Sequence, residues 1–259
     1  IRANKSILSL KYPRIGRLPF SNIPFRFSKT PVEVKPGPIP GQNTKDILAS
    51  GWGNHRSPKP KGYFGPKGPI KKGVLDGITI VDMTEGLTGP YASLILADAG
   101  AKVIKVEPPD GDYARNFAPS LVNGVSAQFI QLNRNKEGIR LNIKVKADRE
   151  RLLELLKNAD VFIEEKGQRQ LKNFGLSYAD LENINPGLIY CSLSDHGTKG
   201  PLRNQPASEL TLQAMSDHLA TLGIPGEEPV RMGPDMASMG SSLFLTHGIL
   251  AALYHKWRT

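Results

Sequence analysis

Cysteine is nearly absent from this sequence, which has one cysteine, Cys191, in 259 residues. A single thiol excludes a disulfide framework and a cysteine-rich zinc module, because both need several cysteines. We also see no apolar run of the ~18 residues that a membrane helix requires. We therefore expect a soluble protein of a reducing compartment, cytoplasmic, with no membrane partner.

The sequence also lacks the short motifs of several enzyme classes. The first glycine-bearing turn, EGLTGPYA at 85–92, does not match the G-x-G-x-x-G dinucleotide fingerprint. Neither a Walker motif nor a G-x-S-x-G nucleophile elbow is present. The five histidines show no metal spacing, although His247 and His255 fall two turns apart if they share a helix. These absences disfavour a nicotinamide dehydrogenase and predict no metal site.

Basic residues and prolines are concentrated before residue 74. Residues 1–73 hold fifteen Lys and Arg, only two acidic residues and eleven of the 21 prolines. This composition predicts an extended, linker-like backbone. A basic extension attracts phosphates non-specifically, but no interleaved aromatic pattern marks an RNA-binding face, so we expect no nucleic-acid partner. A transit peptide is a further alternative, although the repeated prolines are unsuited to its amphipathic helix.

From Val74 onward, β-branched runs alternate with helical patterns. The short apolar runs predict strands at 78–83, 102–107, 140–144, 160–164 and 188–193. Helical spacing predicts helices at 91–99, 147–158 and 177–184, then two longer ones at 209–222 and 238–256. Such alternation predicts an α/β fold with a Rossmann-like, mostly parallel sheet and flanking helices. Its ligands would bind at the carboxyl ends of the strands.

The remaining candidate chemistry is a set of carboxylates near glycine-rich turns and a polar cluster, Asn133-Arg134-Asn135-Lys136. Arg and Asn supply directed donors and Lys a point charge, so the cluster is suited to phosphates. An ordinary solvated turn has the same composition. The residues alone leave both interpretations open.

Several strings taken together resemble the class III CoA-transferases, the CaiB/BaiF family. They are LDGITIVDMT, GPYASLILADAGAKVIKVE, the 111–115 string GDYAR, LNRNK, FGLSYADL, NPGLIYCSLS and LQAMS. The resemblance covers residues 74–259 in order. It implies the large domain of that family, incomplete here, with coenzyme A or acyl-CoA as substrate and no tightly bound cofactor. It also implies a smaller second domain and an interlocked dimer.

The basic segment resembles another part of the same family. The strings PFRFSKTP at 24–31 and GQNTKDIL at 41–48 are similar to its carboxyl-terminal end. We therefore expect residues 1–53 to end a preceding copy, 54–73 to be a linker, and 74–259 to begin a second, truncated copy. The chain would be a fragment of a tandem protein, paired as an interlocked homodimer or an intramolecular pseudo-dimer.

The resemblance also implies roles for particular residues. The family uses a carboxylate nucleophile that forms a mixed anhydride and then an enzyme–CoA thioester, passing CoA from an acyl-CoA to a small carboxylic acid. The family nucleophile is an Asp four residues before a Q-A motif, where this sequence has Glu209. The coenzyme-binding positions carried over are Gly89, Pro90, Glu107, Arg115, Asn133, Arg134 and Lys136. Each has a structural alternative: a helix start, an ion pair or a surface residue.

Three further positions depart from the family pattern. EKGQR at 165–169 replaces N-F-R-P-G, SDHG at 194–197 replaces S-G-F-G, and Ser238 replaces an acid. Glu209 itself adds one methylene to the nucleophile, and a ~1 Å misplacement can cost ~100-fold in rate. Two hypotheses follow: an active CoA-transferase that uses Glu209, or a CoA-binding scaffold copy whose active Asp lies in the other copy.

Overall fold

A computed structural model of the chain describes residues 5, 7–12, 16–21, 73–119, 126–222, 224 and 226–258. Within the amino-terminal segment, β1 (Ile7–Tyr12) and β2 (Gly16–Ser21) form an antiparallel pair of their own. The strings at 24–31 and 41–48, and nearly all of the expected linker, lie outside the described residues. The division at residues 53 and 73 therefore stays a prediction.

Five parallel strands form the central sheet. They are β3 (Thr79–Met83), β4 (Lys102–Glu107), β5 (Lys136–Arg140), β6 (Val161–Glu164) and β7 (Ile189–Ser192). Their order is β5-β4-β3-β6-β7, and every pairing is parallel. The chain runs outward from β3 to β5 and then returns to β6 on the other side of β3. Such a reversal creates a crevice at the carboxyl ends of β3 and β6, where α/β proteins bind ligands.

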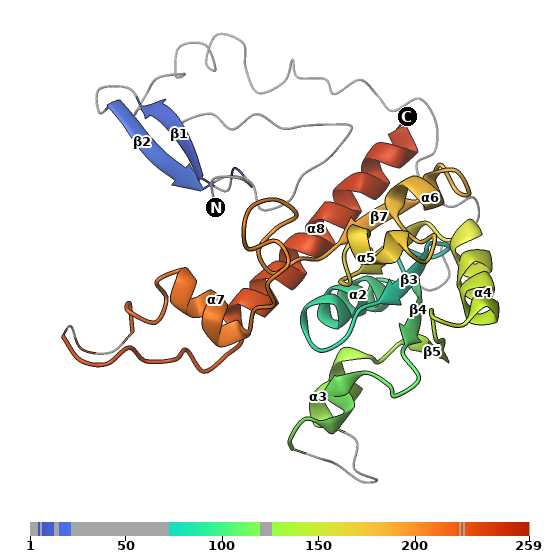
Figure 1. Ribbon diagram of the computed structural model, residues 1–259, viewed down its shortest axis with the longest axis horizontal. Coiled ribbons are helices and arrows are strands. Elements are labelled where there is room, and N and C mark those ends of the chain that lie inside the picture. Colours follow the sequence, from blue (N-terminus) through green and yellow to red (C-terminus); the bar gives the residue numbers. More distant parts are fainter. Residues whose placement is uncertain are drawn as a thin grey trace.

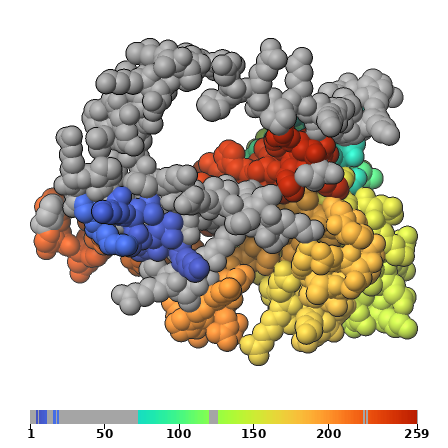
Figure 2. Space-filling model, turned by 90° about the horizontal axis from the view of Figure 1, so that it is seen from above, coloured from blue at the N-terminus to red at the C-terminus, as the bar shows by residue number. Residues whose placement is uncertain are grey.

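Helices cover both faces of this sheet (Figure 1). They are α2 (Thr88–Asp98), α3 (Ala127–Leu132), α4 (Lys146–Lys157), α5 (Gln168–Lys172), α6 (Tyr178–Glu182), α7 (Glu209–Met215) and α8 (Met236–Arg258), with a 3-10 turn, η1 (Tyr113–Asn116). The core is divided accordingly into two apolar clusters. Ile80 packs with residues of α2 and α8, and its neighbour Val81 packs with residues of α4, α5 and α6. Successive side chains of a buried strand point to opposite faces of the sheet, which explains the division. Figure 2 shows the atoms of the α4 to α6 region as one continuous mass. The predicted α/β fold is confirmed.

The long helix α8 packs one face against α2. Its buried side chains are Ser242, Thr246, Ile249 and Leu253, which recur at helical spacing. By length and composition alone α8 is apolar enough to cross a membrane, with a mean hydropathy of 1.4 over 18 residues. The expectation that no apolar run reaches this length is therefore wrong for α8. The helix contributes Ile249 and Leu253 to the core, while 22% of the apolar window is buried.

Two predicted boundaries are also wrong. The third strand of the sheet is Lys136–Arg140 and not 140–144, because pairing with β4 selects a segment with only one large apolar residue, Ile139. Helix α7 ends at Met215 and does not continue to 222. Asp217 turns the backbone to φ +65°, which ends the helix.

Candidate active site

A buried carboxylate, Asp82, lies near the carboxyl end of the central strand β3. It accepts hydrogen bonds from the Ser93 hydroxyl at 2.5 Å and from the Thr84 backbone N–H at 3.0 Å, and pairs with the Lys136 ammonium at 3.3 Å. Burial raises the pKa of Asp82, but Lys136, Lys105 and the hydroxyl donors outweigh burial and hold this pKa below its ordinary value. Asp82 is therefore a buried anion.

Lys136 brings together three of the predicted coenzyme-binding residues. Its Nζ donates to the Pro90 carbonyl at 2.9 Å and to Asn133 Oδ1 at 2.9 Å, besides its contact with Asp82. The side chain is 1% exposed, and burial lowers its pKa to about 8, against the opposing effect of Asp82. An ammonium has three hydrogens. All three meet acceptors within the protein, so Lys136 joins β5 to the first turn of α2.

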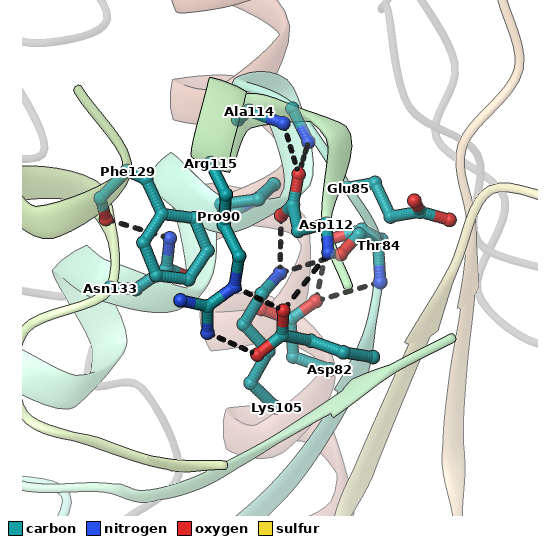
Figure 3. A network of polar contacts seen from close by, with 12 residues as sticks. Asp82, Thr84, Glu85, Pro90, Lys105, Asp112, Ala114, Arg115, Phe129 and Asn133 are labelled. Carbon is teal, nitrogen blue, oxygen red and sulfur yellow. Dashed lines mark hydrogen bonds and ion pairs between the residues drawn. The ribbon is translucent and has the colours of Figure 1, made fainter. Parts of the chain in front are cut away.

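A second buried ion pair connects the loops above β3 and β4. Lys105 Nζ lies 2.8 Å from Asp112 Oδ2 and donates to the Thr84 carbonyl at 2.8 Å. Asp112 Oδ1 accepts from the backbone N–H groups of Gly86 at 2.9 Å and Ala114 at 2.8 Å. Figure 3 shows Asp112 pointing from its loop toward Lys105. The pair fixes the turn after β3 against the turn after β4.

Glu107 and Arg115, both predicted to bind coenzyme, contact each other. The guanidinium donates two hydrogen bonds to the carboxylate, each of 2.7 Å, and lies 3.9 Å from the centre of the Phe129 ring (Figure 3). The hydrogen bond from Arg115 lowers the pKa of Glu107 to about 2, although burial opposes it. The expected alternative for Glu107 is an ion pair with a lysine; the structure pairs it with Arg115 instead. Coenzyme contact by either residue stays a prediction.

The other two predicted coenzyme residues have different surroundings. Gly89 is buried in the first turn of α2, where an added Cβ would overlap the Thr84 side chain. Arg134 pairs with Asp98 at the opposite end of α2, and both side chains are partly exposed. Gly89 therefore lies beside Pro90, whose carbonyl accepts from Lys136, whereas Arg134 lies away from this turn.

Two acids, Glu85 and Glu165, follow the carboxyl ends of β3 and β6 and lie close together. The Glu85 N–H donates to Glu165 Oε1 at 2.8 Å, and the Lys166 ammonium lies 3.1 Å from Glu85 Oε1. Burial, together with the charge of Glu85, raises the pKa of Glu165 to about 8 despite the backbone hydrogen bond and Lys166. Glu165 is therefore mostly protonated at neutral pH. The sequence signal that could have indicated this acid is the pair Glu164-Glu165, which follows the apolar residues of β6 directly.

Glu209 stands apart from these clusters, at the start of α7. Its Oε1 accepts from Gln213 Nε2 at 2.9 Å and from the Ala237 N–H at 2.8 Å. Its Oε2 accepts from Ser238 N at 2.9 Å and from Ser238 Oγ at 2.7 Å. Partial burial raises the pKa of Glu209, but these hydrogen bonds outweigh burial and lower it. The amino-terminal end of α8 thus holds an ionised carboxylate in a fixed position.

Gln213 is the buried residue that orients this carboxylate. Its side chain is 1% exposed, and its Oε1 accepts from the Met232 N–H at 3.2 Å. Its Nε2 also donates to the Pro234 carbonyl at 3.3 Å. Reversing the amide would place donor against donor and acceptor against acceptor, so the amino group faces Glu209. In the sequence, Gln213 stands out only as part of the LQAMS string.

The two regions are linked through the α2–α8 contact. The Ser242 hydroxyl donates to the Thr88 carbonyl at 2.7 Å, so the second turn of α8 lies on the first turn of α2. Gly89, Pro90, Asn133 and Lys136 gather at that turn, while Glu209 lies at the start of α8. In the part of the chain that the structure describes, no three His, Cys, Asp or Glu side chains are placed to hold a metal.

Comparison with known proteins identifies the family. The family described as CoA-transferase family III matches residues 75–259. An acetyl-CoA:oxalate CoA-transferase of Acetobacter aceti is 40% identical over 196 residues, which are 75% of this chain and 49% of that protein. A succinyl-CoA:glutarate CoA-transferase of Mus musculus is 38% identical, over 71% of this chain and 43% of that protein.

A solved structure agrees with these relatives. A CaiB/BaiF family protein from Brucella suis matches with a TM-score of 0.68 and 35% identity, covering 71% of this chain and 50% of that one. The chain therefore belongs to CoA-transferase family III, and the resemblance seen in its sequence is confirmed. It spans about half the length of the curated relatives it matches.

Proposed function

We propose that the protein moves coenzyme A from an acyl-CoA to a carboxylic acid and that Glu209 is the nucleophile. One observation carries the proposal: in a chain of this family, Glu209 is ionised and held by four hydrogen-bond donors at the start of α8. An ionised carboxylate at neutral pH is ready to attack a thioester without prior loss of a proton.

The reaction begins when one Glu209 oxygen attacks the thioester carbonyl carbon. A C–O bond forms, the C–S bond breaks, and the coenzyme thiolate leaves with the electron pair. The thiolate next attacks Glu209 Cδ and expels the donor acid, which leaves a glutamyl–CoA thioester. The acceptor carboxylate then takes the place of the donor and the steps run in reverse.

The substrates belong to the classes that the relatives' names state. Those two relatives are named for acetyl-CoA with oxalate and for succinyl-CoA with glutarate, and a third relative, from Streptomyces avermitilis, is named a formyl-CoA:oxalate CoA-transferase. We infer an acyl-CoA and a small carboxylic acid for this protein, with the coenzyme received at the carboxyl ends of the strands, near β3 and β6. The relatives do not favour the scaffold alternative, because all three carry a transferase name.

We infer in addition that the protein is a tandem of two CoA-transferase copies. The two copies would pair with each other, or with those of a second molecule, in the interlocked arrangement that the family resemblance implies. The support is the similarity of residues 24–31 and 41–48 to the family's carboxyl-terminal end. A cytoplasmic location likewise stays a proposal.

An exchange assay on the full-length protein tests the proposed function. Labelled succinate is incubated with succinyl-CoA, followed by the acetyl and formyl donors with their acids, and entry of label into acyl-CoA is measured. We expect Glu209→Ala to remove the exchange that this copy supports while CoA affinity is retained, because the nucleophile is lost and the strand ends proposed to receive the coenzyme are unchanged. Glu150→Ala, which removes an exposed carboxylate of α4, should leave exchange unchanged. Full exchange by Glu209→Ala would overturn the assignment.

A further inference from the structure

We propose that Gln213 is a catalytic residue: its side-chain amide, together with the Ala237 backbone N–H, forms an oxyanion hole for the carbonyl oxygen of Glu209. The inference rests on the proposed function, because it assigns a role to groups that touch the nucleophile. It concerns the steps in which Glu209 is attacked and not the step in which Glu209 attacks.

The geometry separates the two oxygens of Glu209. Oε1 is held by two rigid donors, the buried Gln213 amide and the Ala237 N–H in the first turn of α8. Oε2 is held by Ser238 through its N–H and through its hydroxyl. Each oxygen accepts one backbone N–H from the first turn of α8, so the two oxygens differ in their second donor. The Ser238 side chain can turn away about its Cα–Cβ bond, whereas the Gln213 amide is held at both its nitrogen and its oxygen. Oε2 is therefore the oxygen that is released to attack, and Oε1 is the oxygen that stays bound.

Charge on Oε1 changes in opposite directions in the first two steps. When Oε2 attacks the thioester, Oε1 becomes the carbonyl oxygen of an anhydride and loses negative charge. When the coenzyme thiolate attacks Cδ, a C–S bond forms and the carbonyl electron pair moves onto Oε1. The Cδ–Oε2 bond then breaks, and the donor acid leaves with Oε2 and the bond's electrons.

Fixed donors at Oε1 therefore stabilise the second transition state, and they slightly oppose the first, in which Oε1 loses charge. Preorganised donors aimed at the oxygen that gains charge are what an oxyanion hole requires. The same donors act again when the acceptor acid attacks the glutamyl thioester, because the electron pair returns to Oε1. The Gln213 amide thus orients Glu209 in the first step and stabilises charge on Oε1 in the steps that attack Cδ.

The test follows the two covalent adducts on the full-length protein. Protein is mixed with succinyl-CoA without an acceptor, denatured at set times, and weighed by intact-mass spectrometry. A succinyl adduct reports the anhydride, and a CoA adduct reports the thioester. In Gln213→Met we expect the succinyl adduct to accumulate and its conversion to slow by ~10²-fold, the order seen when one oxyanion donor is lost. The rate of its formation should not fall.

Controls separate this role from structural damage. Gln170→Met, at an exposed glutamine of α5, should behave as the wild type. Ser238→Ala removes a donor from Oε2, so the succinyl adduct should not accumulate. Misfolding in Gln213→Met would slow both steps together, and that result would overturn the inference.

Two other outcomes are equally distinct. Conversion at the wild-type rate in Gln213→Met, with adducts on Glu209, would overturn the oxyanion role and leave the proposed function intact. Absence of any adduct on wild-type Glu209 with succinyl-, acetyl- and formyl-CoA would overturn both.

Discussion

At the residue scale, charge is buried in matched pairs at the carboxyl end of the sheet. Asp82 faces Lys136, and Asp112 faces Lys105, with each side chain at most 2% exposed. Unpaired buried charges cost several kcal/mol, so each member of a pair holds its partner's element in place. The turns after β3 and β4 are consequently fixed before any ligand arrives.

Glu165 makes the free energy of unfolding depend on pH. Its folded pKa of about 8 lies above the ordinary value of 4.5, so between these pH values the folded state binds more protons than the unfolded state. Its contribution to stability is then complete below about pH 4.5 and is lost as the pH rises to about 8. We expect Glu165→Gln to lose less stability than the wild type between pH 5 and pH 8, as measured by urea unfolding at both values.

The matched control is Glu154→Gln on α4, whose side chain is 67% exposed. It should keep the wild-type dependence on pH. Equal dependence in Glu165→Gln and the wild type would show that Glu165 ionises normally in the folded protein.

At the scale of elements, α8 is positioned by a stripe of small polar residues against α2. Ser242 and Thr246 donate to the Thr88 and Ala92 carbonyls at 2.7 and 3.4 Å, and also to carbonyls one turn back in α8. Small side chains allow the two helices to approach closely. This contact sets the position of the first turn of α8, which holds Glu209.

Adjacent serines offer a matched test of that contact. Ser242 is fully buried and Ser241 is exposed. Ser242→Leu should lower the free energy of unfolding by about 2 kcal/mol, because it overpacks the helix contact and removes a hydroxyl donor. Ser241→Leu should cause no loss, since leucine is the better helix former. Equal values for the two variants in urea unfolding would contradict the packing described here.

The elements that the sequence predicted well are those whose own residues favour them. β3, β4 and β6 are rich in β-branched and apolar residues, as buried parallel strands are, although β3 also contains Asp82 and β4 contains Lys105. β5 was misplaced because its pairing with β4, and not its composition, selects it. The end of α7 was missed because a single left-handed residue, Asp217, ends a pattern that otherwise continues.

At the scale of the whole molecule, the sequence located the candidate residues but not their partners. Glu107 and Arg115 are eight positions apart, and no spacing rule indicates that they pair with each other. The hydrogen bonds from Ala237 and Ser238 to Glu209 join residues nearly thirty positions apart in the sequence. They form only because α8 folds back onto α7. Long-range contacts of this kind need the fold first.

The outer face of α8 is a feature of the whole molecule, because it leaves large apolar side chains exposed. Leu243, Phe244, Leu250 and Tyr254 are between 39% and 53% exposed. The chain spans about half the length of its curated relatives, so the activity assays proposed above use the full-length polypeptide.

The most direct test of the central claim is to locate the covalent intermediate. Full-length protein is incubated with succinyl-, acetyl- and formyl-CoA in turn, trapped with hydroxylamine or borohydride, digested, and mapped by mass spectrometry. We predict modification of the peptide at Glu209, and no modification in Glu209→Ala. Turnover with modification only at another carboxylate would contradict the account.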